Sequence, residues 1–277
     1  MFKKKQIFII GSNARLAKAI IAFYKTENII LVEREIYKNW GEDQHLNSIY
    51  DYFNKQLKLD TIVFITSGIL DSNKSITKLE KVNFHLPWNI IKSLEGTNIK
   101  IITFGTILEK IKGIENLYVK SKIKLSDKIS TLKNRNVLHI RLHTLYGYGL
   151  PSSFMFLGQI FTSLKDSLVF NMSSGVQIRE YHHLDDVAKS IDVLVEKDIT
   201  GVTEITSGTG IELRSLAEGV FKYFELENLL KIGVKRIDQK EKLENNYKKN
   251  EFLKEVDFRH PIIGINSYLE KILQKEK

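Results

Sequence analysis

Two rhythms of apolar and polar positions alternate along the first half of the chain. Continuous apolar runs are typical of buried strands and occur at residues 6–10, 28–32, 60–65, 100–103 and 136–140. Between most of these runs, apolar residues recur every three or four positions, which is typical of amphipathic helices. Strands that alternate with helices predict parallel β-α-β units, and therefore an α/β fold with a doubly wound parallel sheet of the Rossmann type.

Two stretches depart from this regular alternation. Residues 37–58 are polar with a helical rhythm and leave little room for a further strand. Residues 78–94 have the pattern of one amphipathic helix, but Pro87 lies inside it. Because proline removes a backbone donor and clashes with the preceding turn, we expect a kink or an early break there.

The pattern changes after residue 145, where a loop-like segment begins. Amphipathic helices are expected at about 153–164, 211–224 and 264–274, and residues 179–187 open a further one that runs to about 195. Strands are expected near 168–170 and 203–206. Residues 238–256 are highly charged and indicate a solvated helix or loop. We therefore expect a dinucleotide-binding domain of residues 1–145, to which residues 179–206 return. Residues 146–178 and 207–277 would form a smaller, substrate-binding part.

Composition narrows the class of protein. The chain has 277 residues, of which 43% are hydrophobic and 27% charged, as expected for one large or two modest globular domains. It contains no Cys, which excludes disulfides and thiol chemistry and favours a reducing compartment. No apolar run approaches the roughly 20 residues of a membrane span. The basic N-terminus lacks a cleavage site, so we expect a cytoplasmic protein with no membrane partner.

The net charge of +9 allows two interpretations. Basic proteins often bind nucleic acid, but the lysines here are scattered and form no basic patch with interleaved aromatic residues. We therefore expect no nucleic-acid partner and a solvated, Lys-rich surface. Such a surface would also attract an anionic substrate, for example a nucleotide sugar.

The turn after the first apolar run predicts a dinucleotide site. A helix N-terminus at this turn would direct free N–H groups at a pyrophosphate. The usual fingerprint has three glycines, whereas here Ala14 and Ala17 occupy two of the three positions. A strand, turn and helix without a nucleotide is the competing interpretation. The candidate cofactor residues of this turn are Gly11, Asn13, Ala14, Arg15 and Leu16.

Two further strand ends contribute candidates. Glu33 lies 22 residues after Gly11, where an acid accepts hydrogen bonds from the adenosine ribose of NAD. Arg34 would instead meet the phosphate of NADP, and the alternative for both residues is a charged pair at a strand end. The third apolar run leads into small residues that let a strand end approach the cofactor, namely Thr66, Ser67 and Gly68.

Tyr118 and Lys122 are the candidate catalytic residues. In a helix they lie four residues apart on one face, where a lysine ammonium would stabilise the phenolate of the tyrosine. Such a tyrosine exchanges a proton with a carbinol oxygen while a hydride moves on the carbon. A solvated helix face is the alternative. Thr106, twelve residues before Tyr118, would bind the same oxygen, although a turn threonine is equally typical there and Thr103 is not excluded.

Paired His and Asp residues in the second half suggest a metal site. They are His182, His183, Asp185 and Asp186. Adjacent residues of an extended segment point to opposite sides, so we expect no metal site. An aspartate at the start of the following helix is more simply a helix cap.

Taken together, these motifs resemble the extended short-chain dehydrogenase/reductase family, the nucleotide-sugar epimerases, dehydratases and reductases. The resemblance covers nearly the whole chain in the family's order. Its most specific match is the segment Arg179-Glu180-Tyr181-His182-His183-Leu184-Asp185-Asp186-Val187-Ala188. The other matching segments are the Gly11 turn, residues 63–68, Asn83, Tyr118-xxx-Lys122, residues 141–147 and residues 263–269.

The resemblance implies roles for individual residues. Tyr118 would be the acid/base, and Lys122 would lower its pKa and bind the nicotinamide ribose. A hydroxyl of Thr106 or Thr103 would complete the site, and Arg179 would hold the nucleotide end of the substrate. The implied cofactor is NAD or NADP, and the implied substrate is a nucleotide-diphosphate sugar.

The resemblance also narrows the reaction. Dehydratases of the family carry Asp-Glu after the hydroxyl residue, whereas Ile107 and Leu108 follow Thr106 here, which argues against dehydration. The pattern is more similar to reductases that make CDP-linked dideoxyhexoses. The predicted function is therefore an NAD(P)-dependent oxidoreductase of a nucleotide-linked sugar, most simply a 4-keto reductase in surface-polysaccharide sugar biosynthesis.

Three alternatives remain open: a 4-epimerase, a reductase of a non-sugar carbonyl, and a non-catalytic NAD(P)-binding regulatory protein. Family members often pair through the Tyr-Lys helix, so a homodimer is also implied. The apolar residues that would allow it are equally consistent with a core, namely Leu117, Ile123, Leu125 and Ile129.

Overall fold

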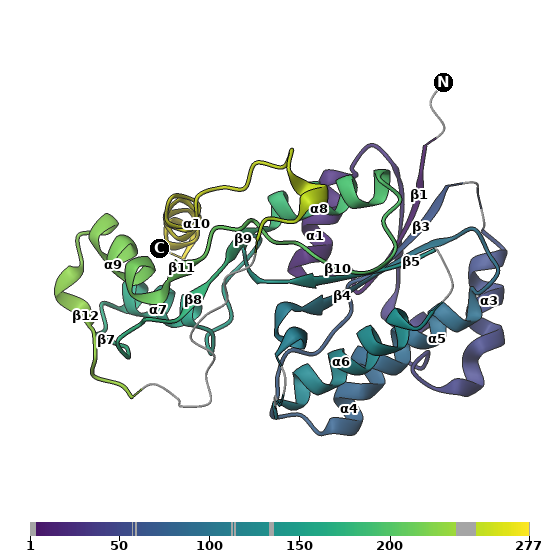
Figure 1. The fold of residues 1–277 in the computed structure, drawn as a ribbon, viewed down its shortest axis with the longest axis horizontal. Helices are drawn as coiled ribbons and strands as arrows, with labels where there is room; N and C mark the ends of the chain where they lie inside the picture. Colours follow the sequence, from purple (N-terminus) through teal and green to yellow (C-terminus); the bar gives the residue numbers. More distant parts are fainter. Residues whose placement is uncertain are drawn as a thin grey trace. The chain divides into compact units, whose positions relative to one another are not determined.

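The computed structural model describes residues 4–56, 58, 60–111, 113, 115–132, 136–236 and 248–276. The chain forms two compact units. The first unit comprises Met1–Leu142 and Leu194–Ile205, and the second comprises His143–Val193 and Thr206–Lys277. Within the described residues, no helix is long and apolar enough to cross a membrane. Figure 1 labels the elements of both units.

A six-stranded sheet with every neighbouring pair parallel forms the centre of the first unit, in the order β10-β5-β4-β3-β1-β2. This confirms the predicted α/β fold. Five of the strands occur where continuous apolar runs were identified, and β10 overlaps the strand expected at 203–206. The four inner strands bury nearly all their side chains, because they are covered on both faces. The bounds of the strands are β1 (Gln6–Ile10), β2 (Asn28–Val32), β3 (Thr61–Ile65), β4 (Lys100–Thr106), β5 (Val137–Leu142) and β10 (Gly201–Glu204).

The segment between β2 and β3 contains only helices in its described residues, as the polar pattern indicated. These are α2 (Arg34–Tyr37), the 3₁₀ helix η1 (Asp43–His45) and α3 (Leu46–Asn54). In the described part of the chain, the sheet therefore has no strand beyond β2, which pairs with β1 alone. As a result, β2 is an outer strand of the sheet.

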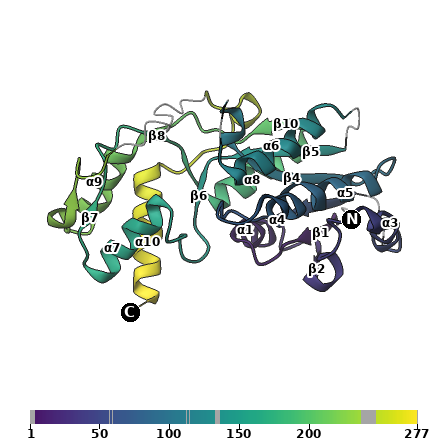
Figure 2. The same ribbon diagram turned by 90° about the horizontal axis from the view of Figure 1, so that it is seen from below.

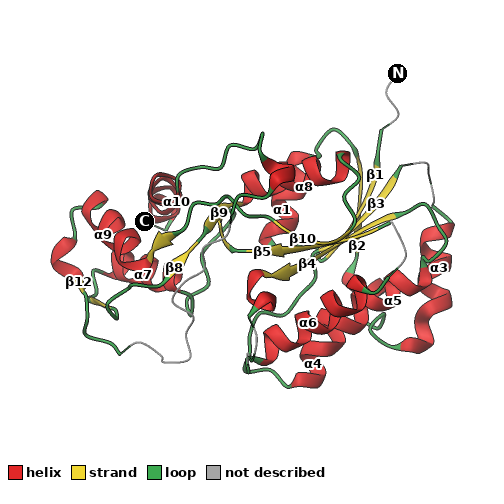
Figure 3. Cartoon of the chain, in the orientation of Figure 1, coloured by secondary structure: helices red, strands yellow, loops and turns green. Residues whose placement is uncertain are grey.

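Helices cover both faces of this sheet. In Figures 1 and 3, α1 (Arg15–Phe23) lies on one face, and α3, α5 (Leu86–Ser93) and α6 (Leu117–Ser130) lie on the other. Figure 2 shows α4 (Ile76–Glu80) and α6 side by side. Leu125 and Ile129 of α6 are buried in the core against the sheet, whereas Leu117 is exposed and Ile123 half-buried. Half of the apolar positions considered for a homodimer are therefore core residues, and the dimer stays a prediction.

The break expected at Pro87 is present. The predicted single helix is divided into α4, the π-helical segment η2 (Lys81–His85) and α5, which begins one residue before the proline. Pro87 sits in the first turn of α5, where its missing N–H costs little. Asn83 lies in the π-helical segment and is fully buried.

The second unit is built mainly from helices over a core of its own. Helix α10 (Pro261–Lys275) packs against α7 (Phe156–Asp166) and α9 (Leu213–Tyr223), as Figure 3 shows. Tyr146, Phe221 and Leu269 are among the residues at the centre of this core. Short strands link the helices, namely β6 (Thr144–Tyr146), β7 (Phe170–Asn171), β8 (Ile178–Arg179), β9 (Tyr181–His183), β11 (Ile211–Glu212) and β12 (Leu230–Lys231).

Several boundaries in this unit differ from those expected. Ile211 belongs to β11, which pairs with β8, so the helix begins two residues later than expected. The strand expected at 168–170 begins at Phe170, because its partner β12 reaches only that residue and the next. Part of the charged stretch 238–256 lies outside the described residues, and the remainder includes the 3₁₀ helix η5 (Glu251–Leu253).

Candidate active site

A pocket of about 850 Å³ opens at the carboxyl ends of β1, β2 and β3. This is the edge at which parallel α/β sheets bind ligands. Most of the predicted cofactor residues line it: Gly11, Asn13, Ala14, Glu33, Arg34, Thr66, Ser67 and Gly68. Arg15 and Leu16 lie in the first turn of α1 and are not part of this lining.

Gly11 is required by the close approach of two strand ends. Its φ is +89°, and a Cβ at this position would lie 2.5 Å from the backbone nitrogen of Ser67. The Thr66 hydroxyl donates to the carbonyl oxygens of Ile10 and Gly11, at 2.9 and 3.0 Å. The turn after β1 and the end of β3 are therefore fixed against each other.

The start of α1 suits an anionic group. No side chain caps the helix at Ala14, so the first N–H groups of α1 are not used by a capping side chain. Nη1 of Arg15 is buried and has no hydrogen-bond partner among the described residues. Uncapped N–H groups at a helix N-terminus fit a pyrophosphate. The pocket therefore fits a dinucleotide, although alanines replace two glycines of the usual turn.

Charged residues gather at the β2 end of the pocket. Glu33 precedes α2, and Arg34 is its first residue. Three lysines also line the pocket, of which Lys38 pairs with Glu35 and Lys81 pairs with Glu42. The positive charges would favour a phosphate on the adenosine ribose, whereas Glu33 would favour a free ribose hydroxyl.

Asn83 connects the pocket to α6. Its amide accepts from the N–H of Ile69 at 2.9 Å and donates to the carbonyl of Ile69 at 3.0 Å. The same amide donates to Oγ of Ser121, which in turn donates to the carbonyl oxygen of Tyr118. The loop after β3 and the helix of the predicted catalytic pair are thus held by one buried side chain.

Lys122 projects from α6 toward the wall of the pocket. Its ammonium donates to the carbonyl oxygen of Phe104 at 2.9 Å, and the residue is only 8% exposed. A Cβ on Gly68 would lie 3.6 Å from Nζ of Lys122. The predicted lysine therefore lies beside a residue that lines the dinucleotide pocket.

The ionisation of the pair differs from the expectation. Burial raises the pKa of Tyr118 well above its ordinary value, and the negative charge of Glu109 raises it further. Burial lowers the pKa of Lys122 to about 8, against the opposing effect of Glu109. In the chain alone the Tyr118 pKa is therefore raised, opposite to the implied lowering, because burial and the charge of Glu109 both disfavour the phenolate.

The two candidate threonines have different surroundings. Thr103 lies inside β4, is 1% exposed, and its hydroxyl is 2.8 Å from Nδ1 of His139. Thr106 ends β4 and caps the 3₁₀ helix η3 (Ile107–Lys110), where its hydroxyl accepts from the N–H of Leu108 at a longer 3.3 Å. A hydroxyl that accepts only one weak bond keeps its proton available for a ligand.

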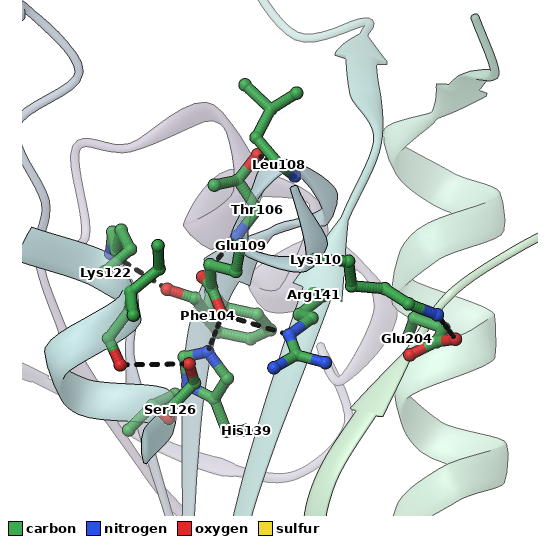
Figure 4. A network of polar contacts seen from close by, with 12 residues as sticks. Phe104, Thr106, Leu108, Glu109, Lys110, Lys122, Ser126, His139, Arg141 and Glu204 are labelled. Carbon is green, nitrogen blue, oxygen red and sulfur yellow. Dashed lines mark hydrogen bonds and ion pairs between the residues drawn. The ribbon is translucent and has the colours of Figure 1, made fainter. Parts of the chain in front are cut away.

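A buried polar network lies at the same strand end (Figure 4). Glu109 accepts from the N–H of Thr106 at 2.7 Å and from Nε of Arg141 at 3.1 Å. Its second oxygen also lies 3.3 Å from Nε2 of His139. The sequence pattern does not reveal this network, although Thr106 and Glu109 have the spacing of a capping box, which the structure contains.

The remaining predicted residues belong to the second unit. Arg179 lies on β8, and its Nη1 donates to the carbonyl of Ile178 at 2.8 Å. His182 pairs with Glu180, at 2.9 Å. His183 accepts from the N–H of Asp185 through Nδ1. The histidines therefore have separate partners rather than a common one, and no group of metal-binding side chains occurs within the described residues.

The two aspartates have a role other than the expected cap. Helix α8 (Leu184–Glu196) begins before them, so they lie within its first turn. Asp185 accepts from the hydroxyl of Tyr148 at 2.7 Å and from Arg259 at 3.2 Å. Asp186 accepts from the N–H of Arg259 at 3.0 Å. The two aspartates therefore anchor the loops that contain Tyr148 and Arg259 to the first turn of α8.

Several solved structures have the same architecture as this chain over nearly its whole length. dTDP-4-dehydrorhamnose reductase of Clostridium acetobutylicum is 15% identical, with a TM-score of 0.76 over 96% of this chain and 99% of that chain. RMD of Pseudomonas aeruginosa, solved with NADPH, is 15% identical, with a TM-score of 0.78 over 99% and 100%. UDP-N-acetylglucosamine 4-epimerase of Bacillus cereus is 17% identical, with a TM-score of 0.73 over 98% and 96%.

No protein-family model matches the chain, and no curated protein matches it. The solved structures therefore carry the comparison, and they cover nearly the full length on both sides. The chain has the fold of these nucleotide-sugar reductases and epimerases. This confirms the predicted resemblance at the level of the fold.

Proposed function

We propose that the protein is an NAD(P)-dependent oxidoreductase that reduces the 4-keto group of a nucleotide-linked sugar. The observation that carries this proposal is the position of Lys122, whose ammonium lies 3.6 Å from where a Cβ of Gly68 would be. Lys122 thus links the helix of Tyr118 to a pocket that fits a dinucleotide. The similar structures solved with NADPH, NADP and NAD support the cofactor class.

The chain's own residues divide the work of reduction. When bound, NADH or NADPH would supply the hydride that C4 of the sugar receives. The Tyr118 hydroxyl donates its proton to the carbonyl oxygen as that oxygen gains the electron pair, so that a C–OH group results. The Thr106 hydroxyl donates a hydrogen bond to the same oxygen and orients it. Lys122 provides the positive charge that stabilises the resulting phenolate.

Tyr118 would act as the proton donor in reduction, and 4-epimerisation is the runner-up. A raised pKa keeps the phenol protonated at neutral pH, which is the form that donates a proton. An epimerase first removes a proton from the sugar hydroxyl and therefore needs the phenolate. The similarity to UDP-N-acetylglucosamine 4-epimerase of Bacillus cereus supports the runner-up.

The second unit would hold the substrate. Within this proposal, Arg179 on β8 binds the diphosphate of the nucleotide, because a guanidinium donates two parallel hydrogen bonds to phosphate oxygens. Residues 146–178 and 207–277 supply most of this substrate-binding part. The nucleotide-diphosphate sugar is the proposed partner of the site.

A direct assay separates these functions. The purified protein is incubated with nucleotide 4-keto sugars and NADPH or NADH, and the products are analysed by mass spectrometry and NMR. A gain of two hydrogens indicates reduction, whereas unchanged mass with inverted stereochemistry indicates epimerisation. Binding of NADPH or NADH without any product across the panel supports the non-catalytic alternative. Reduction of simple aldehydes but not of nucleotide sugars supports the non-sugar alternative.

The two threonines give a matched pair of variants. Thr106→Val removes a hydrogen bond to an oxygen that gains charge, so we expect kcat to fall roughly 10- to 100-fold. Thr103→Val removes the bond to His139, so it should cost about 1 kcal/mol of stability and leave kcat within about twofold. Thr106→Ser, which keeps the hydroxyl, should recover most of the activity. A larger loss of kcat in Thr103→Val would transfer the role to Thr103.

Arg34 allows a test of cofactor choice. Arg34→Ala should weaken NADPH binding by about tenfold or more, because a charge-assisted hydrogen bond to the ribose phosphate is lost. NADH binding should change by less than about twofold, since its ribose carries no phosphate. Fluorescence titration with both nucleotides measures the difference, and Lys25→Ala, an exposed residue outside the pocket lining, is the control. Equal weakening of both cofactors would reject this role for Arg34.

A further inference from the structure

The carboxylate of Glu109 is buried although the proposed reaction does not use it. Its side chain has no exposed surface. Burial alone would raise the pKa of Glu109, but the hydrogen bond and charge of His139, together with hydrogen bonds from the Thr106 N–H and Arg141, outweigh burial and lower it. Glu109 is therefore an anion at neutral pH. A buried charge is costly unless it is paired, so its presence here calls for a reason.

The backbone of β4 leaves room specifically for this carboxylate. A Cβ at Gly105 would lie 2.0 Å from Oε1 of Glu109 and 2.4 Å from Nε2 of His139. Any side chain at position 105 would thus displace both groups. The Glu109 carboxylate occupies the space over Gly105, and the N–H of the next residue, Thr106, points at it.

Lys122 and Glu109 hold the same short stretch of backbone. The ammonium of Lys122 binds the carbonyl of Phe104, and the carboxylate of Glu109 binds the N–H of Thr106, so one residue separates the two anchored groups. Figure 4 shows both side chains at this strand end. Both are buried, so little solvent screens their interaction. The negative charge opposes the effect of burial on the pKa of Lys122 and adds to it for Tyr118.

The other charges around Glu109 do not replace it. Burial lowers the pKa of His139, against the opposing effect of Glu109, and its ring lies between the Glu109 carboxylate and the Thr103 hydroxyl. The side chain of Arg141 is 21% exposed and remains partly solvated. The charged and titratable groups on the surrounding elements include Tyr118 and Lys122 of α6, His139 and Arg141 of β5, Lys110 of η3 and Glu204 of β10, the last two of which form an ion pair at 2.6 Å. The other charged residues of α6 are exposed, namely Lys120, Lys124, Asp127 and Lys128.

We propose that Glu109 is a positioning residue for 4-keto reduction. Its buried negative charge holds the turn that presents the Thr106 hydroxyl, and it keeps Lys122 as an ammonium and Tyr118 as a phenol. This inference rests on the proposed function. In the wild type, the pair is thereby prepared to give a proton to the substrate rather than to take one.

The effect of the Glu109 charge can be measured as a shift in the pKa of Lys122, without cofactor or substrate. The protein is labelled with ¹³C at lysine Cε, and the Lys122 signal is assigned by its loss in Lys122→Met and titrated by NMR from pH 6 to 10. The wild-type midpoint is expected near the pKa of about 8. In Glu109→Gln, which keeps the shape but removes the charge, the midpoint should fall by about one pH unit. Glu204→Gln, which removes a partly solvated carboxylate paired to the neighbouring Lys110, should leave it unchanged.

Activity then tests the positioning role. In Glu109→Gln, kcat should fall about tenfold with little change in KM, since only the transition-state geometry is affected. In a plot of kcat against pH, the limb that reports ionisation of the Tyr118–Lys122 pair should also move to lower pH. Glu109→Asp keeps the charge, so it should keep the wild-type midpoint and profile while lowering kcat through its shorter reach to Thr106.

Each outcome decides the inference. An unchanged Lys122 midpoint in Glu109→Gln, or an equal fall in Glu204→Gln, overturns it. If Glu109→Gln does not fold, Arg141→Gln removes the cation paired with the carboxylate and should raise the Lys122 midpoint, and no rise overturns the inference. A wild-type protein that shows the expected midpoints but reduces no 4-keto sugar refutes the proposed function, while the titration still decides whether Glu109 sets the ionisation of Lys122.

Discussion

Tyr118→Phe is expected to lower the turnover of a nucleotide 4-keto sugar by about 100- to 10,000-fold, the usual contribution of a general acid. The change removes one oxygen from a half-buried ring on α6 and leaves the dinucleotide pocket intact, because Tyr118 is not among its lining residues. NADPH or NADH should therefore bind with an affinity within about twofold of the wild type. Steady-state kinetics and fluorescence titration on the same preparation measure both quantities.

Tyr50→Phe is the matched control for this loss. Tyr50 is an exposed tyrosine of α3, 42% exposed, and its hydroxyl should not affect turnover. Unchanged turnover in Tyr118→Phe would remove Tyr118 from the mechanism. A parallel loss of cofactor affinity would instead indicate that the phenol acts in binding.

Gly11→Ala should destabilise the first unit by roughly 3 kcal/mol or more and weaken dinucleotide binding at least about tenfold. Two costs combine at this position. The φ of +89° disfavours any Cβ, and that Cβ would lie 2.5 Å from a backbone nitrogen that has little freedom to move. Relief of the clash would separate the Gly11 turn from Ser67 and distort the lining of the pocket.

Gly96→Ala separates these two costs. Gly96 has a similar φ of +81°, but a Cβ at this position would have no atom of the described residues within 4 Å. The variant should therefore show only the backbone cost, about 1–2 kcal/mol, with cofactor affinity unchanged. Thermal or denaturant unfolding together with cofactor titration gives the comparison. Equal effects of the two variants would show that contact with Ser67 carries no weight.

The central sheet was predictable because its strands are buried on both faces and appear in the sequence as unbroken apolar runs. Short strands of the second unit were harder to place. A strand such as β11 has only two residues, and it exists because β8, more than thirty residues earlier in the chain, offers an edge to it. Local patterns carry no information about such a partner, so Ile211 was assigned to a helix.

The residues of the candidate site also fall into two groups, those that local spacing predicted and those that only the fold brings together. Tyr118 and Lys122 were identified because four residues separate them on one helix, which is a local relation. The network of Glu109 was missed because His139 and Arg141 reach it from another strand. For the same reason the direction of the Tyr118 pKa was wrong, since burial depends on the whole fold. The roles of these residues in catalysis remain predictions for the variants described above.

Because β2 is an outer strand, a bound cofactor would also stabilise the fold. In the sheet as described, β2 is hydrogen-bonded on one side only, and an outer strand opens more readily than a central one. Glu33 and Arg34 follow this strand directly and line the pocket. A dinucleotide bound at the carboxyl end of β2 would stabilise this outer strand. Binding of the dinucleotide to the folded protein would thus stabilise that state by mass action. The concentration of the cofactor would therefore also affect the fraction of the protein that is folded.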